Sequence, residues 1–131
     1  MSKERIYLFD TTLRDGAQTE GVDFSVEDKN KIASSLSNIG IDYIEGGWPG
    51  ANPTDTSFFN HPPSLNSHLV AFGMTKRSGR SCENDPGISS IINAKINHVC
   101  IVGKSWDFHV DVALVISKDE NLNNIKETAS Y

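Results

Sequence analysis

A short polar segment near the start of the chain places a carboxylate, a guanidinium and an amide within nine residues, Asp10-Thr-Thr-Leu-Arg-Asp-Gly-Ala-Gln18. The carboxylate of Asp15 can hold a divalent cation, and the adjacent guanidinium of Arg14 can hold a carboxylate or an oxygen that becomes negative during a reaction. A surface ion pair of little energetic value would use the same two residues. However, the segment has few apolar side chains to pack, and Gln18 accompanies two threonines and a glycine. This composition favours a loop that binds a ligand.

Three more polar segments follow apolar runs further along the chain. They are residues 45–50, beginning with Glu45 and containing Trp48; residues 75–80, containing Lys76, Arg77 and Arg80; and residues 104–109, containing Lys104, Trp106 and His109. Functional groups of parallel α/β sheets gather at the carboxyl ends of the strands, so we expect these segments to meet the Arg14 loop. His68 and His98 stand at strand starts and are expected at the opposite end, whereas His61 and His109 are expected nearer the functional end.

The apolar runs at residues 6–9, 41–44, 69–72 and 99–102 predict four buried strands. Helix-start signals lie between and after them. These are Ser25 with Asp28, Asn52 before Pro53, Asn84 or Asp85 before Pro86, the apolar residues of 110–114, and Ser117 with Glu120 ahead of Leu122, Ile125 and Ala129. The order is β-α-β-α-β-α-β-α, which predicts parallel strands joined by right-handed crossovers.

The spacing of the predicted strands limits the fold further. They start at residues 6, 41, 69 and 99, intervals of 35, 28 and 30 residues, and a closed TIM (β/α)8 barrel uses about 31 residues per unit. We therefore predict a partial TIM barrel of about the first four βα units: residues 1–131 form a single, truncated domain, the N-terminal half of a catalytic barrel. A small open doubly wound sheet is the alternative. Half a barrel has two unpaired strand edges, which predicts a homo-oligomer or pairing with a missing C-terminal half.

Charge and hydropathy exclude several kinds of partner. Seventeen acidic residues against twelve lysines and arginines give a net charge of -5, which argues against a nucleic-acid surface. No apolar run reaches the roughly 18 residues of a membrane helix, and the first apolar run is too brief for a signal peptide, so we expect a cytoplasmic protein without a membrane partner. Cys82 and Cys100 form no CxxC motif; both are expected as reduced thiols, Cys100 as a small buried residue.

The polar segment at residues 10–18 resembles the opening motif of the 2-isopropylmalate, homocitrate and citramalate synthases, and 3-hydroxy-3-methylglutaryl-CoA (HMG-CoA) lyases begin similarly. Residues 40–53, 71–77 and 102–109 are most similar to the citramalate-synthase branch. The resemblance covers nearly the whole chain. It implies a TIM barrel that carries out a Claisen condensation, in which the enolate of acetyl-CoA attacks the keto carbon of a metal-chelated 2-oxo acid such as pyruvate. Such enzymes serve branched-chain amino-acid biosynthesis, leading to leucine or isoleucine.

The resemblance also implies roles for four residues. Asp15 matches the metal-binding aspartate, and Arg14 matches the catalytic arginine that contacts the 2-oxo acid and stabilises the developing oxygen charge. Gln18 and Glu45 match polar substrate-binding positions, and Glu45 is expected to orient Arg14. The divalent metal, which would be Mg, Mn or Zn, also needs a His-x-His pair that the sequence lacks. We therefore expect an incomplete metal site and no synthase activity from this polypeptide alone.

Several interpretations stay open at this stage. A lyase running related carbon-carbon chemistry in reverse on a CoA ester, and a non-catalytic, self-associating protein that binds small anions, are the alternatives to the synthase. The basic cluster Lys76, Arg77 and Arg80 fits CoA phosphates, a substrate carboxylate or a solvated loop. Trp48 and Trp106 fit either a pocket wall or a cap on the barrel core.

Overall fold

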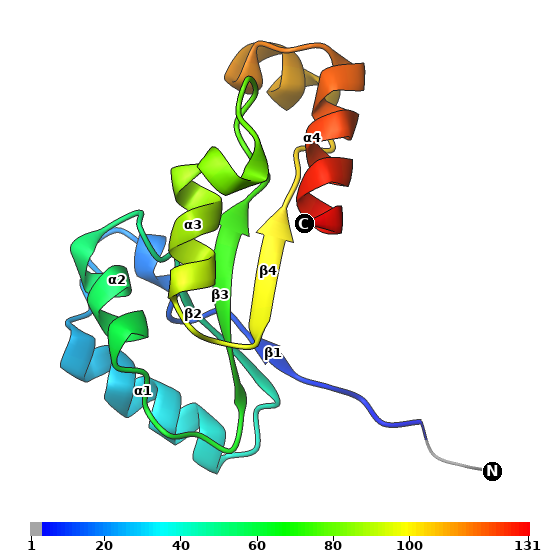
Figure 1. Cartoon of the computed structure of the whole chain (residues 1–131). Helices are drawn as coiled ribbons and strands as arrows, with labels where there is room; N and C mark the ends of the chain where they lie inside the picture. Colours follow the sequence, from blue (N-terminus) through cyan, green and yellow to red (C-terminus); the bar gives the residue numbers. More distant parts are fainter. Residues whose placement is uncertain (1–3) are drawn as a thin grey trace.

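The fold is a four-stranded parallel sheet with strands in sequence order, β1-β2-β3-β4, as the computed structural model shows for residues 4–131 (Figure 1). The strands are β1 (Phe9–Asp10), β2 (Tyr43–Gly47), β3 (His68–Met74) and β4 (His98–Val102). The α-helices are α1 (Val26–Asn38), α2 (Pro53–Asn60), α3 (Pro86–Asn93) and α4 (Lys118–Ser130). Two short 3-10 helices, η1 (Gly16–Gln18) and η2 (Cys82–Asn84), and a π-helix, η3 (His109–Leu114), complete the chain.

The strand order supports the partial barrel over the doubly wound sheet. A doubly wound sheet reverses its strand order at a switch point, whereas successive strands of a TIM barrel are always neighbours. All three strand pairs are parallel, and the predicted alternation of strands and helices is confirmed. The register between β2 and β3 shifts between Glu45 and Gly47, so the end of β2 is irregular where its polar loop begins.

The first strand is shorter than predicted and overlaps residues 6–9 only at Phe9. Its partner β2 begins at Tyr43, whose N–H donates to the Leu8 carbonyl at 3.0 Å. The side chain of Asp42 accepts from the Leu8 N–H at 2.9 Å, so a side chain takes the place that a longer β2 would fill. Residues 6 and 7 therefore have no strand opposite them.

Side-chain caps begin all four α-helices, as the sequence predicts. Ser25, Asn52 and Ser117 each accept a hydrogen bond from the backbone N–H three residues later. Of the two candidates before Pro86, the cap is Asp85, which accepts from two backbone N–H groups of α3. These caps satisfy helix N–H groups that otherwise lack partners, so they fix where each helix begins.

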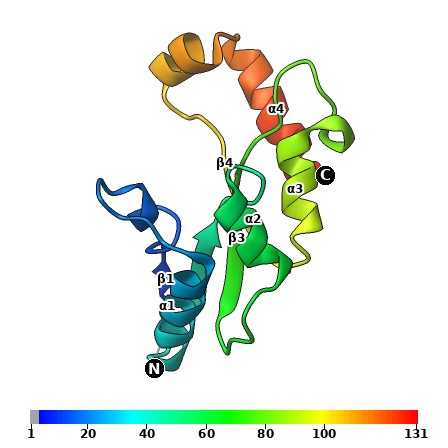
Figure 2. The ribbon, with the colours of Figure 1, turned by 90° about the vertical axis from the view of Figure 1, so that its left-hand side faces the viewer.

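The core lies between the sheet and helices α1, α2 and α3, which cover one face of the strands (Figure 2). Phe58 and Phe59 of α2 are fully or almost fully buried against the sheet, as expected. The remaining buried members of the core are Leu13, Ala33, Ile44, Ala71, Ile91 and Ala94. Leu13 lies directly before Arg14, so the core anchors the polar loop at its base.

Helix α4 packs differently from its predicted apolar stripe, because Leu122 is 62% exposed and Ala129 is also exposed. Two asparagines are buried instead. Asn121 donates to the Lys104 carbonyl at 2.8 Å, and Asn124 donates to Ser78 Oγ at 2.8 Å. The helix therefore packs on the polar loops that follow β3 and β4, beside the sheet (Figure 1).

Large apolar side chains are exposed along the outer edge of β1 and the residues before it. Ile6, Tyr7, Leu8 and Phe9 are 82%, 57%, 52% and 48% exposed. Val99 on the opposite edge strand is 52% exposed. Within residues 4–131, no helix is long and apolar enough to cross a membrane.

Candidate active site

The guanidinium of Arg14 is fixed at the carboxyl end of the sheet by three contacts. Its Nε donates to Oε2 of Glu45 at 2.6 Å, and its Nη1 donates to Oδ1 of Asp15 at 3.1 Å. The ring of Phe72 lies under the guanidinium carbon, 4.4 Å from the ring centroid. The backbone turn that presents Arg14 is held by the Thr11 carbonyl, which accepts from three successive N–H groups. Arg14 is therefore held in one orientation before any substrate arrives.

Glu45 is a buried carboxylate, only 1% exposed, in the middle of β2 and not after the strand as predicted. A buried charge is costly unless it is paired, and the guanidinium of Arg14 provides that pairing. The expected contact between Glu45 and Arg14 is thus present. The thiol of Cys100 on β4 lies beside the same carboxylate; burial, followed by the hydrogen bond to Glu45, raises the pKa of that thiol. Cys100 is half-buried and Cys82 is the buried cysteine, contrary to expectation, because β4 is an edge strand.

Asp15 and Gln18 lie on the solvent side of this pair. The Asp15 side chain is 64% exposed and uses one oxygen on Arg14. Gln18 lines a cavity of about 350 Å³ together with Arg14, Lys29 and Trp48. The structure therefore places Asp15 and Glu45 each in contact with Arg14, and Gln18 on a cavity shared with Arg14. The roles of these residues in binding metal and substrate remain predictions.

Trp48 and Trp106 have different surroundings. Trp48 packs edge-to-face on Phe72, with ring centroids 5.2 Å apart, and lines both the cavity beside Arg14 and a second one of about 340 Å³. Trp48 is therefore a pocket wall. Trp106 is 59% exposed and contacts the rings of Phe108 and His109, so it does not cap the core.

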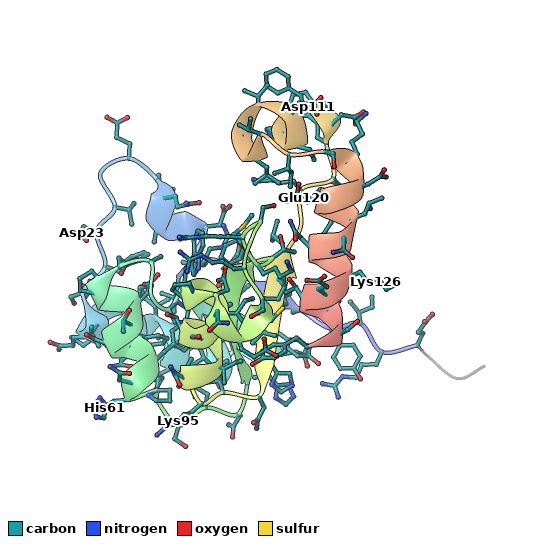
Figure 3. All side chains as sticks on the ribbon, turned by 45° about the horizontal axis from the view of Figure 1, so that its top comes forward. Asp23, His61, Lys95, Asp111, Glu120 and Lys126 are labelled. Carbon is teal, nitrogen blue, oxygen red and sulfur yellow. The ribbon has the colours of Figure 1, made fainter. Side chains whose placement is uncertain are left out.

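The histidines divide between the two ends of the sheet, with one correction. His68 and His98 begin β3 and β4, with ring centroids 4.3 Å apart at the end opposite Arg14. His61 lies toward that same end of the sheet (Figure 3), next to Pro62, which shares a cavity with His68 and His98. This is contrary to expectation, because His61 follows α2 after the helix has run back along the sheet. Only His109 stays on the functional side, in η3 after β4.

The donor groups do not make a complete divalent-metal site. Within residues 4–131, no three or more His, Cys, Asp or Glu side chains are grouped closely enough to hold a metal ion. Asp15 offers a single exposed carboxylate, and Mg²⁺, Mn²⁺ or Zn²⁺ needs several protein or substrate ligands. Among the described residues, Asp15 therefore supplies one ligand of such a site and the set of ligands is incomplete.

The basic cluster after β3 is mostly engaged within the protein. Lys76 is 7% exposed, and its amino group contacts Glu127 at 2.9 Å and the Arg80 carbonyl at 2.9 Å. The hydrogen bond from Lys76 lowers the pKa of the Glu127 carboxyl. The solvated-loop interpretation does not hold for Lys76, since the lysine is buried and ties α4 to the loop after β3. Lys76 also lines the second cavity, so its role in binding a ligand stays a prediction. The side chain of Arg77 lines the second cavity with Lys104.

One buried ion pair beneath the site was not expected from the sequence. Lys29 of α1 is 2% exposed and contacts Asp55 of α2, which is 8% exposed. Lys29 lies four residues before the buried Ala33, on the core-facing side of α1. A lysine on the apolar side of a helix is the signal that could have identified it.

Comparisons with known proteins show the family and the fold. The family model "HMGL-like" matches residues 5–131. The chain is 51% identical to an (R)-citramalate synthase of Aquifex aeolicus (strain VF5), an alignment that covers 98% of this chain and 25% of the relative. It is 32% identical to 2-isopropylmalate synthase 1 of Caldanaerobacter subterraneus subsp. tengcongensis, over 100% of this chain and 32% of the relative.

A solved structure shows the same fold. The HMG-CoA lyase of Bacillus subtilis superposes with a TM-score of 0.69 at 18% identity, covering 98% of this chain and 42% of that chain. The chain thus spans a quarter to a third of the length of these curated synthases. The family match extends from the polar loop at β1 through the end of α4. This chain belongs to the HMGL-like family.

Proposed function

We propose that the chain forms the first half of the catalytic barrel of a citramalate-synthase-like acyltransferase, which condenses acetyl-CoA with a 2-oxo acid such as pyruvate. The observation that carries the proposal is the guanidinium of Arg14, held by Glu45 and Phe72 with its Nη2 making no hydrogen bond among the described residues. The names of the most similar relatives support the substrate class. By the same reasoning, the pathway is branched-chain amino-acid biosynthesis, leading to isoleucine or leucine, in the cytoplasm.

The proposed role of Arg14 follows from the charge that the reaction develops. When a general base has taken a proton from the methyl carbon of acetyl-CoA, the enolate forms a bond to the keto carbon. The keto oxygen takes the electron pair as an alkoxide and is then protonated to the hydroxyl group. A guanidinium fixed beforehand stabilises that charge without reorganising. Nη2 of Arg14 would bind this oxygen or the substrate carboxylate, and Gln18 would contact the substrate from the adjoining cavity. Hydrolysis of the thioester then releases CoA and the hydroxy diacid.

A bound divalent metal would polarise the keto group as a Lewis acid. We propose Asp15 as one of its ligands, since its carboxylate stands beside Arg14 and is 64% exposed. Within residues 4–131, no group of three or more His, Cys, Asp or Glu side chains could complete such a site. The lyase alternative has less support, since the likeness to the lyase structure at 18% identity concerns the fold.

A chimera tests the proposal directly. This chain would replace the aligned segment of the Aquifex aeolicus relative, with which it shares 51% identity. We expect the folded chimera to release CoA from acetyl-CoA and pyruvate, and Arg14→Gln to lower kcat/KM by about 10²–10³-fold, the cost of removing one preorganised donor. Glu27→Gln, at an exposed ion pair on α1, is the matched control. Equal activity of the chimera and its Arg14→Gln variant would refute the role of Arg14.

A further inference from the structure

The ammonium group of Lys29 lies under the loop that carries Arg14 and the strand that carries Glu45. Its Nζ donates to the Leu13 carbonyl at 2.8 Å and to the Gly46 carbonyl at 2.9 Å, and its third donor contacts Oδ1 of Asp55. An ammonium has three N–H donors, so every donor of this buried group is used.

The two carbonyls belong to the immediate neighbours of the site residues. Leu13 precedes Arg14, and Gly46 follows Glu45. Two connections therefore join the loop after β1 to β2. One is the side-chain ion pair between Arg14 and Glu45, and the other is the pair of hydrogen bonds from Lys29 to the backbone carbonyls. The hydrogen bonds from Lys29 act on the backbone, and the backbone determines the positions of the Cα atoms of Arg14 and Glu45.

Asp55 extends this connection to α2 and to the loop after β2. Its Oδ2 accepts from the Trp48 N–H at 2.8 Å and from Asn52 Nδ2 at 3.1 Å. Gly47 has a φ of +144°, and a Cβ there would lie 2.5 Å from the Asp55 carboxyl carbon. The carboxylate thus occupies the space that any larger residue at position 47 would need.

We infer that Lys29 is a positioning residue: through the Leu13 and Gly46 carbonyls it sets the separation at which Arg14 and Glu45 pair. Its importance for catalysis rests on the proposed function, but its effect on Arg14 does not. Lys29 borders the cavity beside Arg14 but is only 2% exposed, and its three N–H donors are all used within the protein, so we assign it no contact with substrate.

The experiment follows the Nε–H proton of Arg14 by NMR in the whole chain. Lys29→Met would leave the buried carboxylate of Asp55 without its cationic partner, so the test variant combines Lys29→Met with Asp55→Asn. The matched controls are Lys31→Met, an exposed lysine on the same helix, and Ile91→Val, a buried change in α3 away from the site. We expect solvent exchange of the Arg14 proton to be at least about tenfold faster in the double variant, with both controls within about twofold of the unmodified chain.

If the Arg14 proton exchanges equally slowly in the folded double variant and in the unmodified chain, Lys29 does not position Arg14 and the inference is overturned.

If the double variant does not fold, native-state hydrogen exchange in the unmodified chain tests the inference. We expect the Lys29 ammonium and Arg14 Nε–H protons to be exposed by the same opening, with equal dependence on denaturant; earlier opening at Arg14 alone would overturn the inference. Pyruvate titration of the unmodified chain separately tests whether Arg14 binds substrate, so failure of the proposed function is distinguishable.

Discussion

Nε of Arg14 and Oε2 of Glu45 lie 2.6 Å apart although 31 residues separate them in sequence. The contact joins the loop after β1 to β2 and pairs a carboxylate that is only 1% exposed. Glu45 accepts from Nε of Arg14, and Asp15 accepts from Nη1. No described residue hydrogen-bonds to Nη2, so this nitrogen is available to a ligand. The orientation of this one side chain therefore depends on two neighbouring strands.

The first prediction concerns Glu45→Gln. The amide can still accept a hydrogen bond but carries no charge, so Arg14 loses a charge-assisted bond worth about 1.5–3 kcal/mol. In the chimera with the Aquifex aeolicus relative, we expect kcat/KM for pyruvate to fall about 10–100-fold, while the far-UV circular dichroism stays unchanged. Glu27→Gln should have no effect, since that carboxylate is exposed on α1. An unchanged kcat/KM in Glu45→Gln would show that Arg14 needs no fixed partner.

The second prediction concerns metal binding by the chain alone. With Asp15 as the one ligand proposed, calorimetry should show Mg²⁺ and Mn²⁺ binding with a dissociation constant of about 10⁻³ M or weaker. The weakly bound Mn²⁺ should broaden the amide signals of residues 15–18 in NMR spectra, and Asp15→Asn should abolish that broadening. Asp23→Asn, in the same polar loop region and exposed, is the control. Tight binding of one metal ion per chain would contradict this prediction.

The fold could be predicted from the sequence because its signals are local. Caps such as Ser25 and Asn52, and short apolar runs between them, fix the order and type of the elements without knowledge of the whole. The regular spacing of the strands favoured the barrel but left a doubly wound sheet open, and the observed strand order supports the barrel. Where the prediction was wrong, a tertiary contact is the reason. The Asp42 side chain accepts the hydrogen bond from the Leu8 N–H that a longer β2 would accept, so β1 is short. In α4, Asn121 is buried and Leu122 is exposed because the helix packs on polar loops.

The candidate site was only partly predictable. Arg14 and Asp15 could be identified by residue type and position after a strand, because parallel strands place their carboxyl ends together. Glu45 lies within β2, and its role was implied only by the family resemblance. The burial of Lys76 could not be deduced in this way, since it depends on Glu127, a partner distant in sequence. A lysine in a loop has the same appearance in a sequence whether its ammonium group ends in water or beside the carboxylate of another element. For Lys29 the available signal was its place on the apolar side of α1.

The third prediction is a pH effect at Asp85, the cap of α3. Burial opposes ionisation of this carboxyl, but hydrogen bonds from the backbone N–H groups of Arg77, Ile88 and Gly87 outweigh it and lower the pKa of Asp85. A lowered folded-state pKa contributes stability above the unfolded value of about 3.9, and that stability is lost as the pH falls through the folded pKa. Asp85→Asn should therefore reduce the free energy of unfolding at pH 7 by about 1–2 kcal/mol, with a smaller difference below about pH 4.

Urea unfolding at pH 7 and at pH 3 measures this difference. Glu83→Gln is the control, because Glu83 is exposed in the adjoining 3-10 helix, and its difference from the unmodified chain should not change with pH. An Asp85→Asn difference that is equally large at both pH values would show that the charge of Asp85 does not stabilise the cap.

The fourth prediction compares two glycines with positive φ. Gly47 has φ +144° and faces the Asp55 carboxylate, whereas Gly79 has φ +77° and no atom within 4 Å of the place that a Cβ would take. Ala at either site incurs backbone strain of about 1 kcal/mol or more. Only Gly47→Ala adds a clash with a carboxylate that Lys29 and the Trp48 N–H hold in place. We expect Gly47→Ala to lower the free energy of unfolding by at least about 2 kcal/mol more than Gly79→Ala, measured by urea unfolding; equal losses would contradict the clash.

The fifth prediction concerns self-association through the edge of β1. An exposed apolar strand edge offers unpaired N–H and C=O groups to another chain, and Leu8 and Phe9 are 52% and 48% exposed there. We expect the 131-residue chain to elute from size exclusion as oligomers whose size increases with concentration in the micromolar range. Leu8→Lys should shift the chain toward the monomer, because a lysine at an edge opposes strand pairing. Ile39→Lys is the control, since Ile39 is 76% exposed at the end of α1, away from the sheet edge. A monomer at all concentrations, or equal effects of the two lysines, would show that the β1 edge is not the surface through which chains associate.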